Sequence, residues 1–118
     1  MNVNPIIISA LDGLTFNGEV VSVTPIVNTS SEKPNAYITY YTLLDKDEAY
    51  SDDEAMLSGT YVTVDVFCKG NYKTLVEHVK LLLKSAGFTV QSIGPEQYEK
   101  DTGLYHVPID LYMEGFYG

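Results

Sequence analysis

The residues of this chain that could do chemistry are two histidines, one cysteine and a set of carboxylates. His78 has no cysteine or aspartate at the spacing of a nucleophile and its base. His106 shares one face of an expected strand with Asp110, but residues i and i+4 of a strand lie about 13 Å apart, too far for a dyad. Cys68 ends an apolar pattern, which is typical of a buried thiol. The sequence therefore predicts a protein that is not an enzyme.

The densest group of carboxylates lies in residues 45–56. Its first two acids have the initial spacing of a calcium-binding loop, but Tyr50 stands where that loop needs glycine and Met56 where it needs glutamate. We therefore expect no metal and no cofactor. The segment is interpreted as a solvated acidic loop, or alternatively as the rim or lumen of an assembly. Its acidic residues are Asp45, Asp47, Glu48, Asp52, Asp53 and Glu54.

The overall charge argues against a nucleic-acid-binding protein. The chain has 16 acidic residues and seven lysines, no arginine, and a formal net charge of −9. Proteins that bind DNA or RNA neutralise phosphates with lysine and arginine and read guanine with arginine. We expect this surface to repel a passing nucleic acid instead of holding it.

The length of 118 residues predicts one domain over residues 1–118. A single cysteine cannot form an intramolecular disulfide, so we expect synthesis in the reducing cytosol. The early apolar run Ile6-Ile7-Ile8 is too short for a signal peptide or a membrane span.

Spacing and turn residues predict two helices and five strands. A short helix is expected over residues 5–12, with Asn4 as its N-cap, and a long one over residues 71–86, stopped by Gly87. The expected strands cover residues 19–27, 36–44, 60–68, 88–93 and 104–113. This pattern predicts an α+β fold with a mixed, mostly antiparallel sheet of four to five strands.

The long helix is amphipathic, and its apolar stripe is expected to pack on the valine face of the strand at residues 60–68. The stripe consists of Leu75, Val79, Leu82, Leu83 and Ala86, and the valine face of Val62, Val64, Val66 and Cys68. In the last strand, Pro108 cannot donate a ladder hydrogen bond, which indicates a sheet edge at that point.

The opposite face of the strand at residues 60–68 carries Asp65, and an unpaired carboxylate there is costly in a core. This face is therefore expected to meet either solvent or another subunit. Ten tyrosines and no tryptophan favour an interface, since tyrosine combines apolar area with a polar tip. The candidate interface residues are Tyr61, Asp65, Phe67, Phe116 and Tyr117.

Several short segments occur in a fixed order and together carry a resemblance to a known family. They are residues 36–41, 50–53, 59–67, 69–72, 75–76, 86–88 and 98–99, and the turn Asp101-Thr102-Gly103-Leu104-Tyr105-His106. In this order, over residues 5–113, the chain resembles the small tail-completion proteins of long-tailed bacteriophages and prophages. These proteins are also called tail terminators or head-to-tail joining proteins.

The resemblance implies a structural virion protein of the tail, made in the cytoplasm of the bacterial host. Such proteins form a homo-oligomeric ring, expected to be a hexamer, that ends tail elongation and joins the tail to the head. The implied partners are further copies of the chain, the tail-tube protein and a head connector protein, with DNA passing through the lumen and no membrane. The alternative is a cytosolic adaptor or inhibitor, in one version a DNA mimic, that binds a protein partner through its acidic face.

Overall fold

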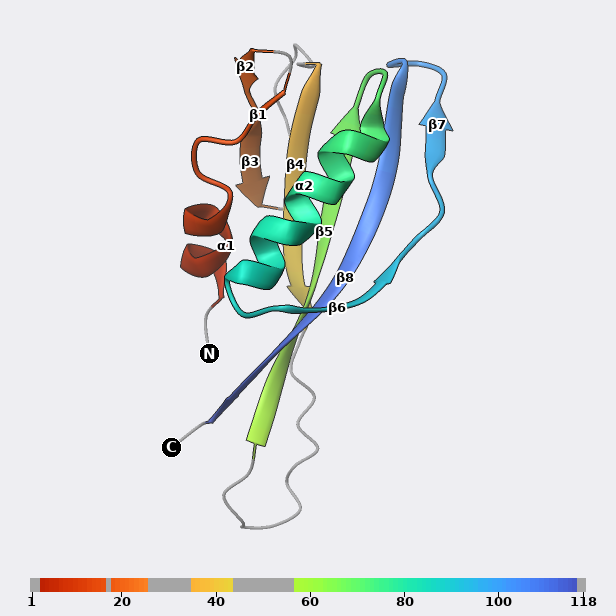
Figure 1. Cartoon of the computed structure of the whole chain (residues 1–118). Helices are drawn as coiled ribbons and strands as arrows, with labels where there is room; N and C mark the ends of the chain where they lie inside the picture. The colour runs from red at the N-terminus through yellow and green to blue at the C-terminus, as the bar shows by residue number, and fades with distance from the viewer. Residues whose placement is uncertain (1–2, 17, 26–34, 44–56, 117–118) are drawn as a thin grey trace.

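The computed structural model describes residues 3–16, 18–25, 35–43 and 57–116 of the chain (Figure 1). The two helices are α1 (Asn4–Ala10) and α2 (Tyr72–Ser85). The strands are β1 (Thr15–Phe16), β2 (Glu19–Val20), β3 (Ser22–Pro25), β4 (Ala36–Leu43), β5 (Leu57–Cys68), β6 (Thr89–Ile93), β7 (Gln97–Glu99) and β8 (Leu104–Phe116). Neither described helix is long and apolar enough to cross a membrane.

Six of the described strands form one main sheet. Its order is β3-β4-β5-β8-β6, and β7 pairs with β8 alongside β6. Strand β3 runs parallel to β4, and the other pairs are antiparallel. Strands β1 and β2 form a separate antiparallel pair. The predicted α+β class, with a mixed and mostly antiparallel sheet, one long helix on one face and a short N-terminal helix, is confirmed (Figure 1).

The predicted number of four to five strands was too low, because the main sheet has six strands in the described residues. Strand β7 was missed because two of its three residues, Tyr98 and Glu99, were expected to belong to a turn over residues 98–103. The expected strand at residues 19–27 divides at Val21, whose backbone N–H donates to the carbonyl of Leu14 at 2.8 Å. As a result β2 pairs with β1, while β3 crosses to β4.

The helix ends follow local rules, with one correction. Val3, and not Asn4, is the N-cap of α1, since the N–H groups of Ile6 and Ile7 donate to the Val3 carbonyl at 3.0 Å. Asn71, expected as the first residue of the long helix, is the N-cap of α2, and its side-chain amide donates to the Thr74 hydroxyl at 2.9 Å.

The C-terminal end of α2 is a Schellman motif. The N–H of Phe88 donates to the carbonyl of Leu83 and the N–H of Gly87 to that of Lys84, at 3.1 and 3.0 Å. Gly87 has φ +107°, a backbone conformation that residues with a Cβ atom rarely adopt and that glycine adopts readily. Leu83 and Phe88 both lie in the core, so the motif also brings a hydrophobic contact to the helix end. The predicted stop at Gly87 is confirmed.

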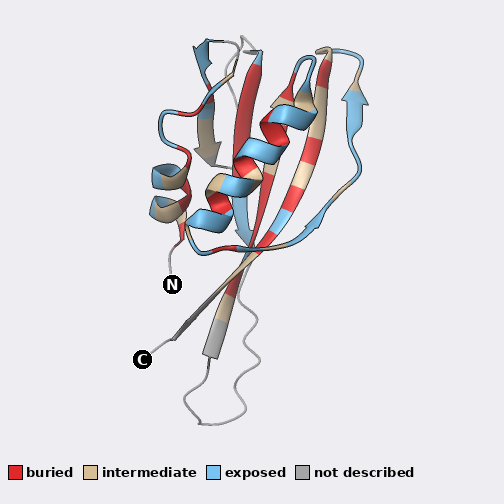
Figure 2. Cartoon of the chain, viewed as in Figure 1, coloured by how far each residue is buried: buried red, intermediate tan, exposed pale blue. Residues whose placement is uncertain are grey.

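The core lies between the helices and one face of the sheet (Figure 2). The valine face of β5 is fully covered there, with Val62 at 1% exposure and the other three side chains at 0%. Helix α2 contributes Leu75, Val76, Val79 and Leu83, and α1 contributes Ile7. The predicted stripe was correct except that Val76 is buried, whereas Leu82 and Ala86 are only partly covered.

Pro108, where the sequence indicates a sheet edge, lies in a strand that has partners on both sides. β8 pairs with β5 on one side and with β6 and β7 on the other. The Pro108 carbonyl accepts from the N–H of Gly94 at 2.8 Å, on the side of β6 and β7. A residue's N and C=O point to the same side of a strand. The proline nitrogen therefore faces the interval between β6, which pairs with residues 109–112, and β7, which pairs with residues 104–106.

Strands β5 and β8 are longer than predicted at one end. Residues 57–60 of β5 pair with residues 113–116 of β8, beyond the last described partners of both strands in β4 and β6. The two strands therefore continue as a two-stranded ribbon past the helical layer (Figure 1).

Candidate functional site

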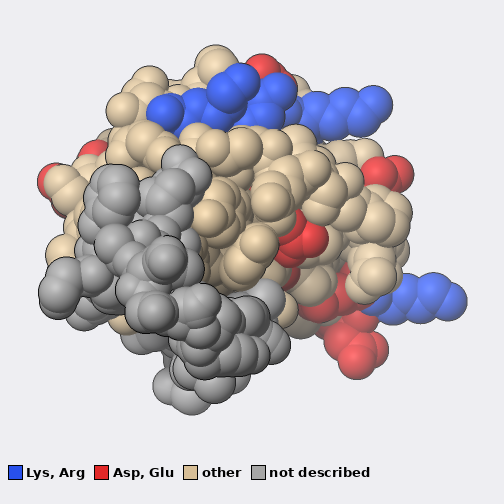
Figure 3. Space-filling view, turned by 90° about the horizontal axis from the view of Figure 1, so that it is seen from below, with Lys and Arg blue, Asp and Glu red and all other residues tan. Residues whose placement is uncertain are grey.

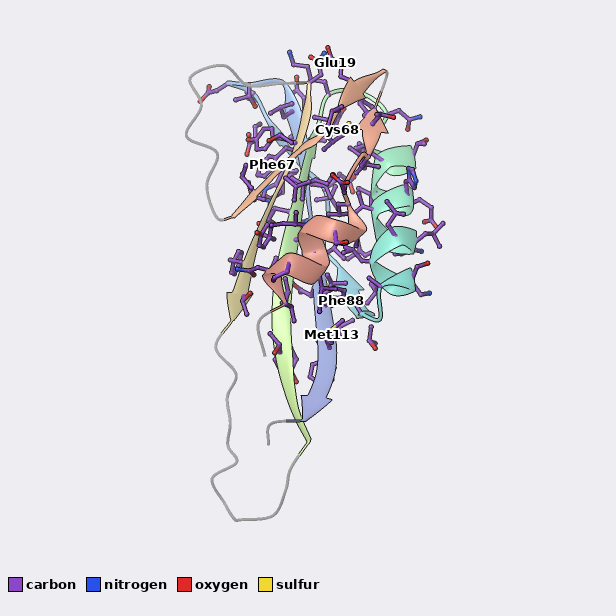
Figure 4. All side chains as sticks on the ribbon, turned by 90° about the vertical axis from the view of Figure 1, so that its left-hand side faces the viewer. Glu19, Phe67, Cys68, Phe88 and Met113 are labelled. Carbon is purple, nitrogen blue, oxygen red and sulfur yellow. The ribbon has the colours of Figure 1, made fainter. Side chains whose placement is uncertain are left out.

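The candidate site is the sheet face turned away from the helices, which we call the outer sheet face. Because side chains alternate along a strand, the residues between the core positions of β4, β5 and β8 share this face. Figure 4 shows the contrast at one step of β5, where Phe67 and Cys68 point to opposite sides. The face consists of Tyr37, Thr39, Tyr41, Tyr61, Thr63, Asp65, Phe67, His106, Pro108, Asp110 and Tyr112.

Three aromatic rings cross the sheet in one row of this face. Tyr37, Phe67 and His106 lie opposite one another on β4, β5 and β8. The rings of Tyr37 and Phe67 stack with centroids 4.5 Å apart and an interplanar angle of 9°. Those of Phe67 and His106 stack at 4.4 Å and 12°. Cross-strand aromatic pairs of this kind stabilise a sheet, so Phe67 is enclosed by its neighbours.

Asp65 is paired with His106, with 2.9 Å between Oδ1 of the aspartate and Nε2 of the histidine. The side chains are 16% and 24% exposed, respectively. The two residues are diagonal neighbours, since Asp65 lies opposite Pro108 and His106 opposite Phe67. This contact gives the mid-strand carboxylate a hydrogen-bond partner and so offsets the free-energy cost of removing it from water. Sequence reasoning missed the pair, because it appears only once the register of β5 and β8 is known.

Asp110 links three strands. Its Oδ1 accepts a hydrogen bond from the hydroxyl of Thr63 on β5, and its Oδ2 accepts one from Ser92 on β6, both at 3.0 Å. Asp110 remains exposed, whereas Thr63 is buried. The carboxylates of Asp65 and Asp110 thus each bond to neighbouring side chains of the sheet.

The exposed end of the outer sheet face carries tyrosines. Tyr41 and Tyr61 are 41% and 40% exposed. The ring of Tyr61 contacts that of Tyr112 at 4.8 Å, with an interplanar angle of 47°. Tyr112 lies over Gly59, where a Cβ atom would overlap its ring. This end offers aromatic surface with polar tips and one exposed carboxylate, a composition suited to protein contact.

The predicted interface residues behave differently from one another. Tyr61, Asp65 and Phe67 share a face as expected, but of these three only Tyr61 is well exposed. The side chain of Phe116 and all of Tyr117 lie outside the described residues. The same holds for the acidic loop residues Asp45, Asp47, Glu48, Asp52, Asp53 and Glu54.

The remaining residues of chemical interest lie apart from this face. Cys68 is fully buried, and burial raises the pKa of its thiol to about 11. His78 is exposed on α2 and lines a shallow hollow of about 480 Å³ with Lys73, Thr74, Glu77 and Leu81. Within the described ranges, no three His, Cys, Asp or Glu side chains are grouped so that they could hold a metal ion.

A second aromatic cluster, not anticipated from the sequence, joins α2 to β7 and β8. The ring of Tyr105 contacts Tyr72 at 4.7 Å and Tyr98 at 5.0 Å. Tyr72 and Glu96 also line a cavity of about 270 Å³. Desolvation, followed by the charge of Glu96, raises the pKa of the Tyr72 hydroxyl. The cluster holds the start of α2 against the strand that follows the turn at residues 100–103.

Comparisons with known proteins add support for the fold alone. No protein-family model matches this sequence, and no curated protein matches it. A solved structure, of a protein without a descriptive name, has 18% sequence identity and a TM-score of 0.50. The alignment covers 84% of this chain and 82% of the other. The likeness is consistent with the α+β arrangement described above.

Proposed function

We propose that this chain is a structural protein whose copies form a ring at the head-proximal end of a phage tail tube. The ring ends tail elongation and joins the tail to the head. The observation that carries the proposal is the outer sheet face, whose polar side chains bond to one another while Tyr41 and Tyr61 remain available for contact. Such a face is suited to binding a protein surface.

The side-chain pairing within this face supports a role in assembly. Binding a partner removes water from polar groups, and this costs free energy unless those groups have hydrogen-bond partners. Asp65 already has His106, and Asp110 already has Thr63 and Ser92. The face can therefore be covered by a neighbouring subunit without leaving these carboxylates unpartnered.

The sequence resemblance supplies the specific role. It favours a hexameric ring with the tail-tube protein and a head connector as partners, located in the virion tail after synthesis in the host cytoplasm. Six copies would carry a formal charge of −54, from six times −9. A lumen lined by such subunits would let DNA pass without retaining it, because like charges repel.

Negative-stain electron microscopy with light scattering over a wide concentration range tests the proposal. Closed rings of uniform diameter are the expected result. A monomer at every concentration, together with no binding to isolated tails, would contradict the ring and favour an adaptor or inhibitor. Neutralising the acids of residues 45–54 then separates the two, since only the adaptor requires them for binding its partner.

A further inference from the structure

The side chains of α2 and those of the outer sheet face carry formal charges of opposite sign. Helix α2 presents three lysines and one glutamate, a formal sum of +2 from Lys73, Lys80, Lys84 and Glu77. Figure 3 shows lysines gathered along the helical side of the molecule. The outer sheet face contains two carboxylates, Asp65 and Asp110, and no lysine among its described residues, a formal sum of −2 with His106 neutral.

The two surfaces also offer side chains that can pack against one another. Beside α2 lies the hollow bounded by Lys73, His78 and Leu81, and Leu81 is 51% exposed. The outer sheet face presents Tyr41 and Tyr61 at its exposed end. A tyrosine ring can pack against a leucine and the alkyl stem of a lysine, with the ammonium group over the ring face.

We infer that the exposed end of the outer sheet face of one copy binds the solvent-facing surface of α2 on a second copy. In this contact, Tyr41 and Tyr61 occupy the hollow beside α2, and Asp110 lies near the lysines of that helix. The inference rests on the proposed function, since it names the surfaces through which the ring closes.

Charge also favours this contact over a symmetric one. Two outer sheet faces placed together would bring −2 against −2, and two α2 surfaces would bring +2 against +2. Like charges placed together across an interface disfavour association. A contact between different surfaces is heterologous, and repeated contacts of this type close into a ring when the rotation between subunits permits. The helices and the outer sheet face lie on opposite sides of the molecule, so one copy can contact two neighbours at the same time (Figure 4).

Charge exchange at Lys73 and Asp110 tests the inference. Lys73→Glu places a negative charge in the first turn of α2, where the helix dipole favours it, so the subunit should fold normally. Either Lys73→Glu or Asp110→Lys alone should raise the dissociation constant of assembly by about tenfold or more, as measured by sedimentation velocity. The double variant Lys73→Glu with Asp110→Lys should recover most of the loss.

Matched controls separate local contact from total charge. Lys100→Glu changes the net charge as much as Lys73→Glu does, but lies in the exposed turn after β7, and should leave assembly unchanged. Asp110→Asn retains a side chain able to bond with Thr63 and Ser92, and tests the charge if Asp110→Lys does not fold. All variants are compared at one ionic strength, because salt weakens local attraction and also screens the repulsion between copies of net charge −9.

The outcomes distinguish the inference from the proposed function. Normal rings from Lys73→Glu and Asp110→Asn would overturn the inference and leave the ring function standing. Charge-dependent association that never closes would support the inference and count against the ring. If Lys73→Glu weakened assembly no more than Lys100→Glu does, and the double variant showed no recovery, the inference would also be overturned.

Discussion

Removing the carboxylate of Asp65 should destabilise the subunit itself. The distance of 2.9 Å to His106 and the low exposure of both side chains indicate a hydrogen bond with little competition from water. Hydrogen bonds to charged groups contribute roughly 1.5–3 kcal/mol, and the variant leaves the imidazole without this partner. We expect Asp65→Ala to lower the free energy of unfolding by about 2 kcal/mol. In a domain of this size that corresponds to a Tm about 6–10 °C lower.

Two further variants isolate the pair. Asp65→Asn retains an oxygen that can accept from His106 and should cost less than about 1 kcal/mol. His106→Phe retains a ring that can stack on Phe67, and it removes the hydrogen bond and leaves the Asp65 carboxylate without this partner. Urea unfolding followed by circular dichroism, at a concentration where the protein is monomeric, gives the free energies. A double-mutant cycle of Asp65→Ala and His106→Phe should give a coupling energy of about 1 kcal/mol or more.

A coupling energy below about 0.3 kcal/mol would refute the reasoning, because independent sites add within that margin. The pair also decides which carboxylate of this face should be used to test assembly. Because Asp65 bonds to His106, a charge reversal such as Asp65→Lys is expected to weaken the subunit as well as any assembly, so the exposed Asp110 is the better choice.

Two predictions concern the packing of the core and the sheet. In Gly94→Ala, the new Cβ would lie 2.7 Å from Cγ of Pro108. We therefore expect the free energy of unfolding, measured in urea, to fall by about 1–3 kcal/mol. The control Gly13→Ala has nothing within 4 Å of the new Cβ and should show only the strain of its positive φ. Cys68 should react with a thiol reagent only after unfolding, because its thiol is buried and its pKa is raised to about 11. Burial favours the neutral thiol and raises its pKa from the ordinary 9.0 to about 11, so this contribution to stability is fully present below pH 9 and should be lost as the pH rises through 11. Cys68→Ala has no thiol and should not show this loss. Equal pH dependence of the two proteins would contradict that assignment.

The elements that were correctly predicted depend on residues close together in the chain. The stripe of α2 recurs at helical spacing, the valines of β5 alternate, and Gly87 lies where the helix must end. Each signal arises within a few residues, and so it can be read without knowing the fold. The α+β class follows from these signals together. The short strand β7 carried no comparable signal, since its three residues are polar or aromatic and adjoin a turn.

The amino-acid sequence by itself determined the helices, the long strands, the buried face of β5 and the acidic character of the chain. Only the tertiary structure decided that β8 lies inside the sheet, that Pro108 faces the interval between β6 and β7, and that Asp65 meets His106. These facts depend on strand order and register, which join residues 41 positions apart in the case of Asp65 and His106. Register is fixed by packing over the whole sheet, because a shift of one residue would move every side chain to the other face.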